Sequence, residues 1–202
     1  MAQGRNLFQQ LEIEAFRAGI TPRTKQSIEW FRRKASQLGK VSIPDIMDEP
    51  ELSKSSRAVT DTGPIGNMYM FQYDPKYRIS LPYYDAFPLV IITGARKGGF
   101  IGMNLHYLPP ILRAKFLDAL MDNVTSKKSP DAKFKLTTRL LASASDLEYY
   151  KPCIKHYLNE HVRSNFAEVK APEWEIATFL PTALFEKADQ RKVYNDSRRM
   201  IR

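Results

Sequence analysis

The spacing of the apolar residues changes along the chain, and this change limits the folds that the chain can adopt. Near the N-terminus, apolar residues such as Leu7, Leu11 and Ala15 recur at helical intervals. We therefore expect a helix over residues 7–19 that ends at Gly19. Between residues 67 and 106 the apolar residues instead form short runs of the kind found in strands. Helical segments on both sides of a group of short strands predict an α+β fold.

Three strands are expected in the middle of the chain, at residues 67–73, 89–92 and 100–106. The last two flank a turn at residues 93–99 that contains glycines and carries Arg96 and Lys97. Three short antiparallel strands indicate a small SH3-like β-barrel or sheet, with residues 174–180 as a candidate for a further strand.

Helices are expected around this sheet. Thr21 and Pro22 are interpreted as the N-cap and first turn of a second helix that Gly39 closes. Another helix is expected to begin at Pro109-Pro110, and further helices over residues 133–144, 152–162 and 182–199. Three prolines interrupt residues 40–66, which predicts an extended linker. The expected organisation is an N-terminal helical arm with linker (1–66), an α+β core (67–186) and a basic C-terminal tail (187–202).

The chain of 202 residues has a net charge of +9, and the excess of positive charge lies at its two ends. Residues 1–40 hold eight basic and three acidic residues, and residues 187–202 hold six and two, whereas residues 41–186 hold 17 of each. We therefore expect extended basic helical arms at both termini to contact an acidic partner, either nucleic acid or an acidic protein subunit. The alternative is that the terminal helices are simply solvated.

Twelve side chains are candidates for partner binding. Nine are basic residues of the arms, and three belong to a segment rich in proline and aromatic residues, which suits a rigid protein interface. The alternative for the three aromatic residues is that they cover the core of their own domain. The candidates are Arg23, Lys25, Arg32, Arg33, Lys34, Arg191, Lys192, Arg198, Arg199, Tyr83, Tyr84 and Phe87.

We expect no catalytic site, no metal and no cofactor. Cys153 is the only cysteine, so an internal disulfide is excluded and a reducing compartment is favoured. His156 and His161 have the wrong spacing for two ligands on one helix, and the glycines match no nucleotide-binding loop. No segment predicts a signal peptide or a membrane span. One enzymatic alternative is a Mg²⁺-dependent nuclease that uses Glu168 and Lys170, with Asp146 as a second carboxylate.

Several segments together resemble a virion protein of large contractile-tailed bacteriophages related to the T4-like cyanophages. The resemblance covers about residues 25–197. Its motifs are the segments 68–76, 81–90, 99–109, 150–158 and 174–181. It implies a protein made in the host cytoplasm and placed in the virion, where its partners are other virion proteins rather than a membrane or a small-molecule substrate.

Two positions in the particle agree with this resemblance. The first is a baseplate or tail-hub component, a non-enzymatic structural subunit whose arms lock neighbouring subunits together. The second is a neck or head-completion protein that binds DNA and protects its end. The expected function is the first, with DNA-end protection as one alternative and the nuclease as another.

Overall fold

A five-stranded antiparallel sheet forms the centre of the protein in the computed structural model, which describes residues 7–21, 24–38, 65–124, 139, 148–170 and 173–200. The strand order is β5-β4-β3-β1-β6, and a separate antiparallel ribbon pairs β2 with β7. The strands are β1 (Met68–Met70), β2 (Tyr84–Asp85), β3 (Leu89–Arg96), β4 (Gly99–Asn104), β5 (Ile154–Leu158), β6 (Ala167–Val169) and β7 (Phe185–Glu186).

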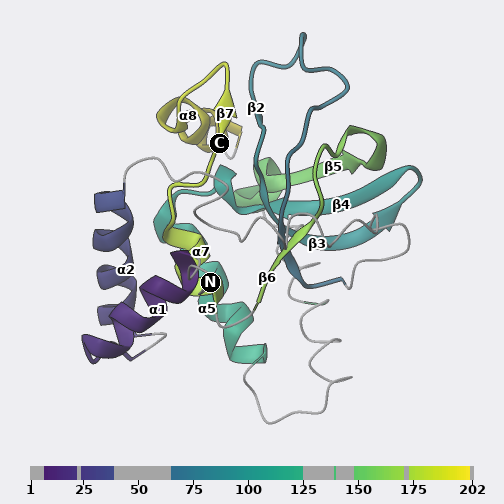
Figure 1. Cartoon of the computed structure of the whole chain (residues 1–202). Coiled ribbons are helices and arrows are strands. Elements are labelled where there is room, and N and C mark those ends of the chain that lie inside the picture. Colours follow the sequence, from purple (N-terminus) through teal and green to yellow (C-terminus); the bar gives the residue numbers. More distant parts are fainter. Residues whose placement is uncertain are drawn as a thin grey trace, which may run out of the picture.

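Helices cover one face of this sheet. Figure 1 shows α1, α2, α5 and α7 gathered on one side of it and α8 beside β7. Helix α7 lies at the centre of this layer, because α1, α2 and α5 all contact it. The helices are α1 (Leu7–Arg17), α2 (Lys25–Leu38), α5 (Pro110–Val124), α7 (Trp174–Phe179) and α8 (Gln190–Met200), with the 3₁₀ helices η1 (Leu105–Tyr107), η2 (Glu148–Cys153) and η3 (Asn159–His161). None of the helices described has the length and apolarity needed to cross a bilayer.

Both faces of the sheet are buried, which explains why its central strands are apolar without interruption. Successive side chains of a strand point to opposite faces. In β1, Met68 and Met70 therefore contribute to the core beneath the helices, while Tyr69 lies on the opposite face. The core on that opposite face, called here the aromatic cluster, consists of Tyr69, Phe71, Val90, Ile92, Phe100 and Tyr157, with Tyr73, Val162 and Phe166 packed against it.

The mixture of helices and antiparallel strands agrees with the α+β prediction, but the predicted SH3-like barrel is not found. Among the described strands the sheet is open, with β5 and β6 at its two edges. Residues 174–180, the candidate for a further strand, form α7 and its C-cap instead. This short helix is buried on nearly all sides, and its two polar residues, Glu175 and Thr178, do not form the exposed face that gives a surface helix its period.

The ends of the first two helices follow from local hydrogen bonds. Gly19 adopts a left-handed conformation after α1, as predicted, and its N–H donates to Phe16 O at 3.0 Å. At the start of α2 the cap is Thr24 rather than the predicted Thr21. The Thr24 hydroxyl accepts the Ser27 N–H at 3.1 Å, and the Ser27 hydroxyl accepts the Thr24 N–H at 3.0 Å.

The described parts of both chain ends fold onto the core, in contrast to the extended arms predicted from charge. In α1 the side chains of Phe8 and Leu11 are buried, and in α8 Val193 is fully buried. The serine at the start of α2, Ser27, donates to the carboxylate of Glu175 in α7. These apolar faces gain stability by being covered in their own subunit.

Two further helix predictions are corrected, and one lies outside the described residues. Residues 152–162, predicted as a helix, are divided among the end of η2, the strand β5 and η3. The predicted helix 182–199 is reduced to α8 at its end, because β7 and a turn precede it. The predicted helix 133–144 and the predicted linker lie almost wholly outside the described residues, while the helix predicted at Pro109-Pro110 is confirmed as α5.

Candidate functional site

The segment between β1 and β2 projects away from the sheet (Figure 1) and is fixed at both of its ends. Near its start, the backbone carbonyl of Asp74 lies 2.8 Å from Nδ1 of His161, and the Asp74 carboxylate forms ion pairs with Arg78 at 3.3 Å and with Arg163 at 3.7 Å. These pairs are exposed to solvent and therefore weak individually. Together they hold residues 74–78 beside η3.

Lys187 holds the far side of the same segment. Its ammonium donates to three backbone carbonyls of the loop, those of Arg78, Ile79 (2.9 Å) and Leu81 (3.1 Å). Lys187 also has a left-handed backbone conformation, with φ of 67°. The loop is thus closed by a cation from the chain segment between β7 and α8.

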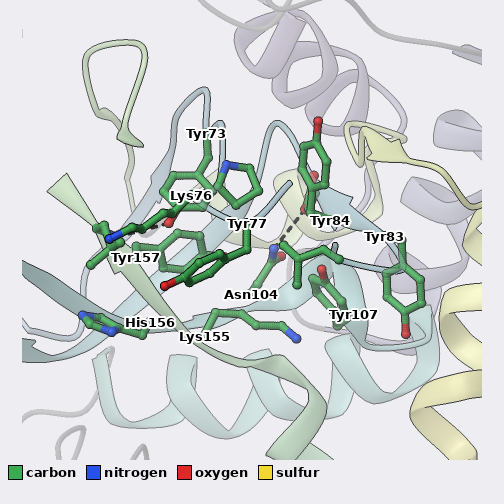
Figure 2. A pocket seen from close by; sticks show the side chains of 14 residues that line it. Tyr73, Lys76, Tyr77, Tyr83, Tyr84, Asn104, Tyr107, Lys155, His156 and Tyr157 are labelled. Carbon is green, nitrogen blue, oxygen red and sulfur yellow. Dashed lines mark hydrogen bonds between the residues drawn. The ribbon is translucent and has the colours of Figure 1, made fainter. Parts of the chain in front are cut away.

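A pocket of about 310 Å³ lies between this loop and the edge strand β5. Its lining is dominated by tyrosines and basic side chains, and Figure 2 shows these groups around the opening. The lining tyrosines are Tyr73, Tyr77, Tyr83, Tyr84, Tyr107 and Tyr157, and the basic side chains are Lys76, Lys155 and His156. Pockets of this size with aromatic walls and a few polar groups are typical of small-ligand sites.

The inner walls of the pocket are rigid because their rings belong to the core. Tyr157 packs against Tyr73 with 4.9 Å between ring centroids and stacks on Phe100 at 5.2 Å. Tyr107 meets Phe185 edge to face at 5.2 Å. By contrast, Tyr77 at the mouth is 64% exposed. The pocket therefore combines fixed walls with one aromatic ring that is open to solvent.

Lys155 is the most unusual charged group of the pocket. Its ammonium lies 4.1 Å from the centroid of the Tyr107 ring, a cation–π contact. It forms no ion pair with any residue that the structure describes. Burial lowers the pKa of Lys155, because the charged form loses contact with water. A partly buried cation without a carboxylate partner favours an anion as its ligand.

A buried hydrogen-bond network lies below the pocket. The Asp85 carboxylate lies 2.7 Å from Nδ1 of His106 and accepts a hydrogen bond from the Asn104 amide at 3.0 Å. On the other side of the ring, Nε2 of His106 lies 2.9 Å from the Thr182 hydroxyl. The arrangement of carboxylate, imidazole and hydroxyl resembles that of a hydrolase. However, Asp85, His106 and Thr182 are 4%, 0% and 4% exposed, so the hydroxyl cannot reach a substrate and the network is structural.

The pKa shifts of this network indicate an ionised carboxylate beside a neutral imidazole. Burial lowers the pKa of His106, and this effect outweighs the attraction of Asp85. Burial alone would raise the pKa of Asp85, but its interactions with His106 and Asn104 and with the Phe87 N–H bring it below the usual value. His106 therefore donates its Nδ1–H to Asp85 and accepts a hydrogen bond from the Thr182 hydroxyl at Nε2.

We expect the free energy of unfolding to fall as the pH drops from about 7 to about 5. A histidine in the unfolded chain has a pKa of about 6.5, whereas the pKa of His106 in the folded protein is lower. The unfolded chain therefore binds more protons as the pH falls, and acid favours the unfolded state. Asp85 adds a further loss of stability below about pH 4, because its folded pKa is lowered. Urea unfolding at several pH values measures this effect. In the His106→Gln variant, the free energy of unfolding should change much less between about pH 7 and about pH 5 than in the natural protein. A natural protein whose stability did not change over that range would contradict the assignment.

Arg113 connects α5 to this network. Its guanidinium donates to the carbonyls of Leu108 at 2.6 Å, His106 at 3.1 Å and Thr178 at 3.3 Å, and to the hydroxyl of Tyr194 in α8 at 2.6 Å. The side chain is 3% exposed. Arg113 thus joins four parts of the chain and supplies a buried positive charge that balances that of Asp85.

The basic residues predicted to bind partners lie on exposed helix faces, with one exception. Lys25, Arg32 and Arg33 are exposed on α2, as are Arg191, Lys192, Arg198 and Arg199 on α8. Lys34 is instead half-buried, and its ammonium forms an ion pair with Glu14 of α1 at 2.8 Å. Arg23 lies outside the described residues.

The three predicted aromatic contacts separate into two groups. Tyr83 and Tyr84 line the pocket, whereas Phe87 is 3% exposed and belongs to the core. Lys192 of α8 lies 6.0 Å from the centroid of the Tyr83 ring, so the basic face of α8 reaches the rim of the pocket. The segment rich in proline and aromatic residues was interpreted as a rigid protein interface or as a cover of the core, and contact with a partner stays a prediction. The contribution of Lys155 was missed, because residues 152–162 were predicted as a helix.

The residues of the nuclease alternative are accounted for by the sheet. Glu168 of β6 is exposed and accepts a hydrogen bond from the Asn67 amide at 2.9 Å, while its neighbour Val169 is buried. Lys170 is exposed at the end of the strand, and Asp146 lies outside the described residues. Within the described part of the chain, no group of three or more metal-ligating side chains comes together.

Comparison with known proteins places the chain in one family. Residues 9–200 match the family model described as phage T4 terminal DNA protecting protein. No curated protein and no solved structure gives a significant match. The match covers nearly all of the sequence and agrees with the resemblance to proteins of T4-like phages noted above. The chain belongs to the phage T4 terminal DNA protecting protein family.

Proposed function

We propose that this protein binds the ends of linear DNA and protects them by occupying them. The family match over residues 9–200 carries the proposal, because the family is described by the protection of terminal DNA. The net charge of +9 and the exposed basic faces of α2 and α8 support it, since phosphate neutralisation dominates the affinity of proteins for DNA. The sequence had left open whether these basic residues contact nucleic acid or an acidic protein subunit.

A pair of charge reversals on α2 tests which face contacts DNA. We expect Arg32→Glu with Arg33→Glu to weaken binding to a linear duplex about equally for all sequences. The slope of log affinity against log salt concentration should become smaller in magnitude by about two. Lys34 is left unchanged, because its ion pair with Glu14 contributes to the fold. Fluorescence anisotropy over a series of salt concentrations measures both quantities.

The matched control carries the same charge change elsewhere. Arg96 and Lys97 are exposed at the tip of the β3–β4 hairpin, so Arg96→Glu with Lys97→Glu alters the net charge equally. If this control weakened binding as much as the α2 pair, net charge rather than the α2 face would explain the affinity. Protection itself is measured by exonuclease digestion of end-labelled linear duplex, with a duplex closed by hairpins at both ends as the competitor. If the closed competitor displaced the protein as well as a linear one does, the proposal would fail.

The baseplate or tail-hub position receives no support from the family match, which favours the alternative of DNA-end protection. We therefore place the protein with the packaged DNA of the phage, acting as a binding protein without catalysis. Incubation of the protein with labelled linear duplex and Mg²⁺ tests whether it catalyses cleavage. If the natural protein released the label and a Lys170→Ala variant did not, the nuclease alternative would be favoured.

A further inference from the structure

We propose that the pocket beside β5 receives the last nucleotide of a DNA strand, with the base on Tyr77 and the phosphate on the ammonium of Lys155. This inference rests on the proposed function and identifies what the protein recognises at an end. A nucleotide inside a duplex is stacked between two neighbours, and it would have to leave both of them to enter such a pocket. A terminal nucleotide leaves only one neighbour.

The size of the pocket suits one nucleotide rather than a duplex. Its volume of about 310 Å³ lies at the lower limit for small-ligand pockets. The fixed walls formed by Tyr107 and Tyr157 prevent it from widening, because both rings are packed into the core. In this arrangement the exposed basic faces of α2 and α8 contact the duplex, and the pocket holds the nucleotide at the end of the strand.

The aromatic rings at the mouth provide a surface for a base of any sequence. Tyr77 is 64% exposed, so its ring gains contact area when a base stacks on it. Figure 2 shows Tyr77 near the middle of the pocket, Tyr83 and Tyr84 to its right, and the Lys155 side chain below them, beside Tyr107. Stacking on tyrosine does not depend on which base is present, as is required of a protein that protects an end without reading it.

Lys155 supplies the contact to phosphate. Its ammonium has the Tyr107 ring as its neighbour at 4.1 Å, and no described carboxylate pairs with it. A phosphate oxygen can thus bind it without displacing an internal partner. Lys76 lies on the same pocket and its ammonium is 5.8 Å from the centroid of the Tyr77 ring, which adds a second positive charge at the mouth.

Asp85 is the only carboxylate among the described residues that line the pocket, and its negative charge is already compensated. Asp85 accepts hydrogen bonds from the Asn104 amide, the Phe87 N–H and the Leu184 N–H, in addition to the one from His106. The guanidinium of Arg113, which is buried in the same network, opposes its charge. The pocket therefore presents an aromatic surface with cations to its ligand.

The mechanism predicts an order of affinities among DNA ends. Moving a terminal nucleotide into the pocket breaks its base pair, and this cost is smallest where the pair is already absent. Duplexes that end in a mismatch or a short overhang should bind more tightly than blunt duplexes, and duplexes closed by hairpins should bind most weakly.

Direct binding of a short oligothymidylate tests the pocket independently of end protection. The probe carries a 5′-phosphate and a fluorophore at its 3′ end, a second probe has the phosphate and fluorophore exchanged, and a third lacks the terminal phosphate. We expect Lys155→Gln and Tyr77→Ala each to weaken binding at least about tenfold. Lys151→Gln and Tyr149→Ala are the matched controls, since both residues are exposed on η2 outside the pocket, and they should bind as the natural protein does.

Thermal unfolding verifies that the four variants fold equally well, as expected for a half-buried and three exposed side chains. Equal affinity of all four variants for the oligonucleotide, or no binding by the natural protein, would overturn the inference. Equal affinity for phosphorylated and unphosphorylated probes would overturn the role given to Lys155. Full protection of linear duplex by the two pocket variants would reject the pocket while leaving end protection intact. Oligonucleotide binding at the pocket by a protein that fails to protect linear duplex would support the pocket and reject end protection.

Discussion

Replacement of Arg113 by methionine should lower the free energy of unfolding by about 3–5 kcal/mol. Methionine fills a similar volume but donates no hydrogen bond. The carbonyls of Leu108, His106 and Thr178 would lose their buried partner, and each unsatisfied buried group costs about 1–3 kcal/mol. The charge of Asp85 would also lose its buried counterpart. Urea unfolding at neutral pH measures the difference.

Lys115→Met is the matched control for this change. Lys115 lies on the same helix, α5, but is exposed, so its replacement should alter stability by no more than about 0.5 kcal/mol. The loss of stability in Arg113→Lys should lie between those of these two variants, because lysine keeps the charge but not the branched set of donors. A loss below about 1 kcal/mol in Arg113→Met would show that the network contributes less than its geometry indicates.

Gly99→Ala is expected to separate β5 from β4. A Cβ atom at position 99 would lie 1.8 Å from the backbone oxygen of Tyr157, so one of the two strands must move. We expect a loss of about 3 kcal/mol or more in the free energy of unfolding, at the upper end of the range for overpacking. Because β5 carries Lys155 and Tyr157, oligonucleotide binding should be lost together with stability.

Gly94 offers the matched control in the adjacent strand. A Cβ atom at this position would meet no other atom within 4 Å, so Gly94→Ala should change stability by less than about 1 kcal/mol and leave binding intact. Circular dichroism during heating and anisotropy of the labelled oligonucleotide give the two readouts. A Gly99→Ala protein that bound the oligonucleotide normally would show that the β5 edge does not form the site.

Elements with a clear period could be predicted from the sequence, whereas buried irregular elements could not. The first helix and its Gly19 end were predicted because one face is apolar and the other polar. The residues of α7 were a candidate for a further strand, because burial on nearly all sides weakens that contrast. The strand β5 was predicted as a helix, although Ile154 and Tyr157 favour a strand, because its half-buried edge position leaves its alternation weak.

The candidate site was only partly predictable for a different reason. Tyr83 and Tyr84 lie in a dense aromatic segment that is visible in the sequence. The network of Asp85, His106 and Thr182 joins residues far apart in the chain, and no local pattern indicates that they meet. The charge at both ends suggested extended arms, but the apolar faces of α1 and α8 bring those ends back to the core.

The position of Lys187 in the chain has a consequence for the order of assembly during synthesis. The carbonyls that bind its ammonium belong to residues 78–81, and β5, with Lys155, is also made before it. The ribosome therefore releases the entire five-stranded sheet before it supplies the cation that closes the loop. A nascent chain that stops short of this lysine has the strands of the sheet complete, but the loop of residues 78–81 still lacks the cation that binds its carbonyls.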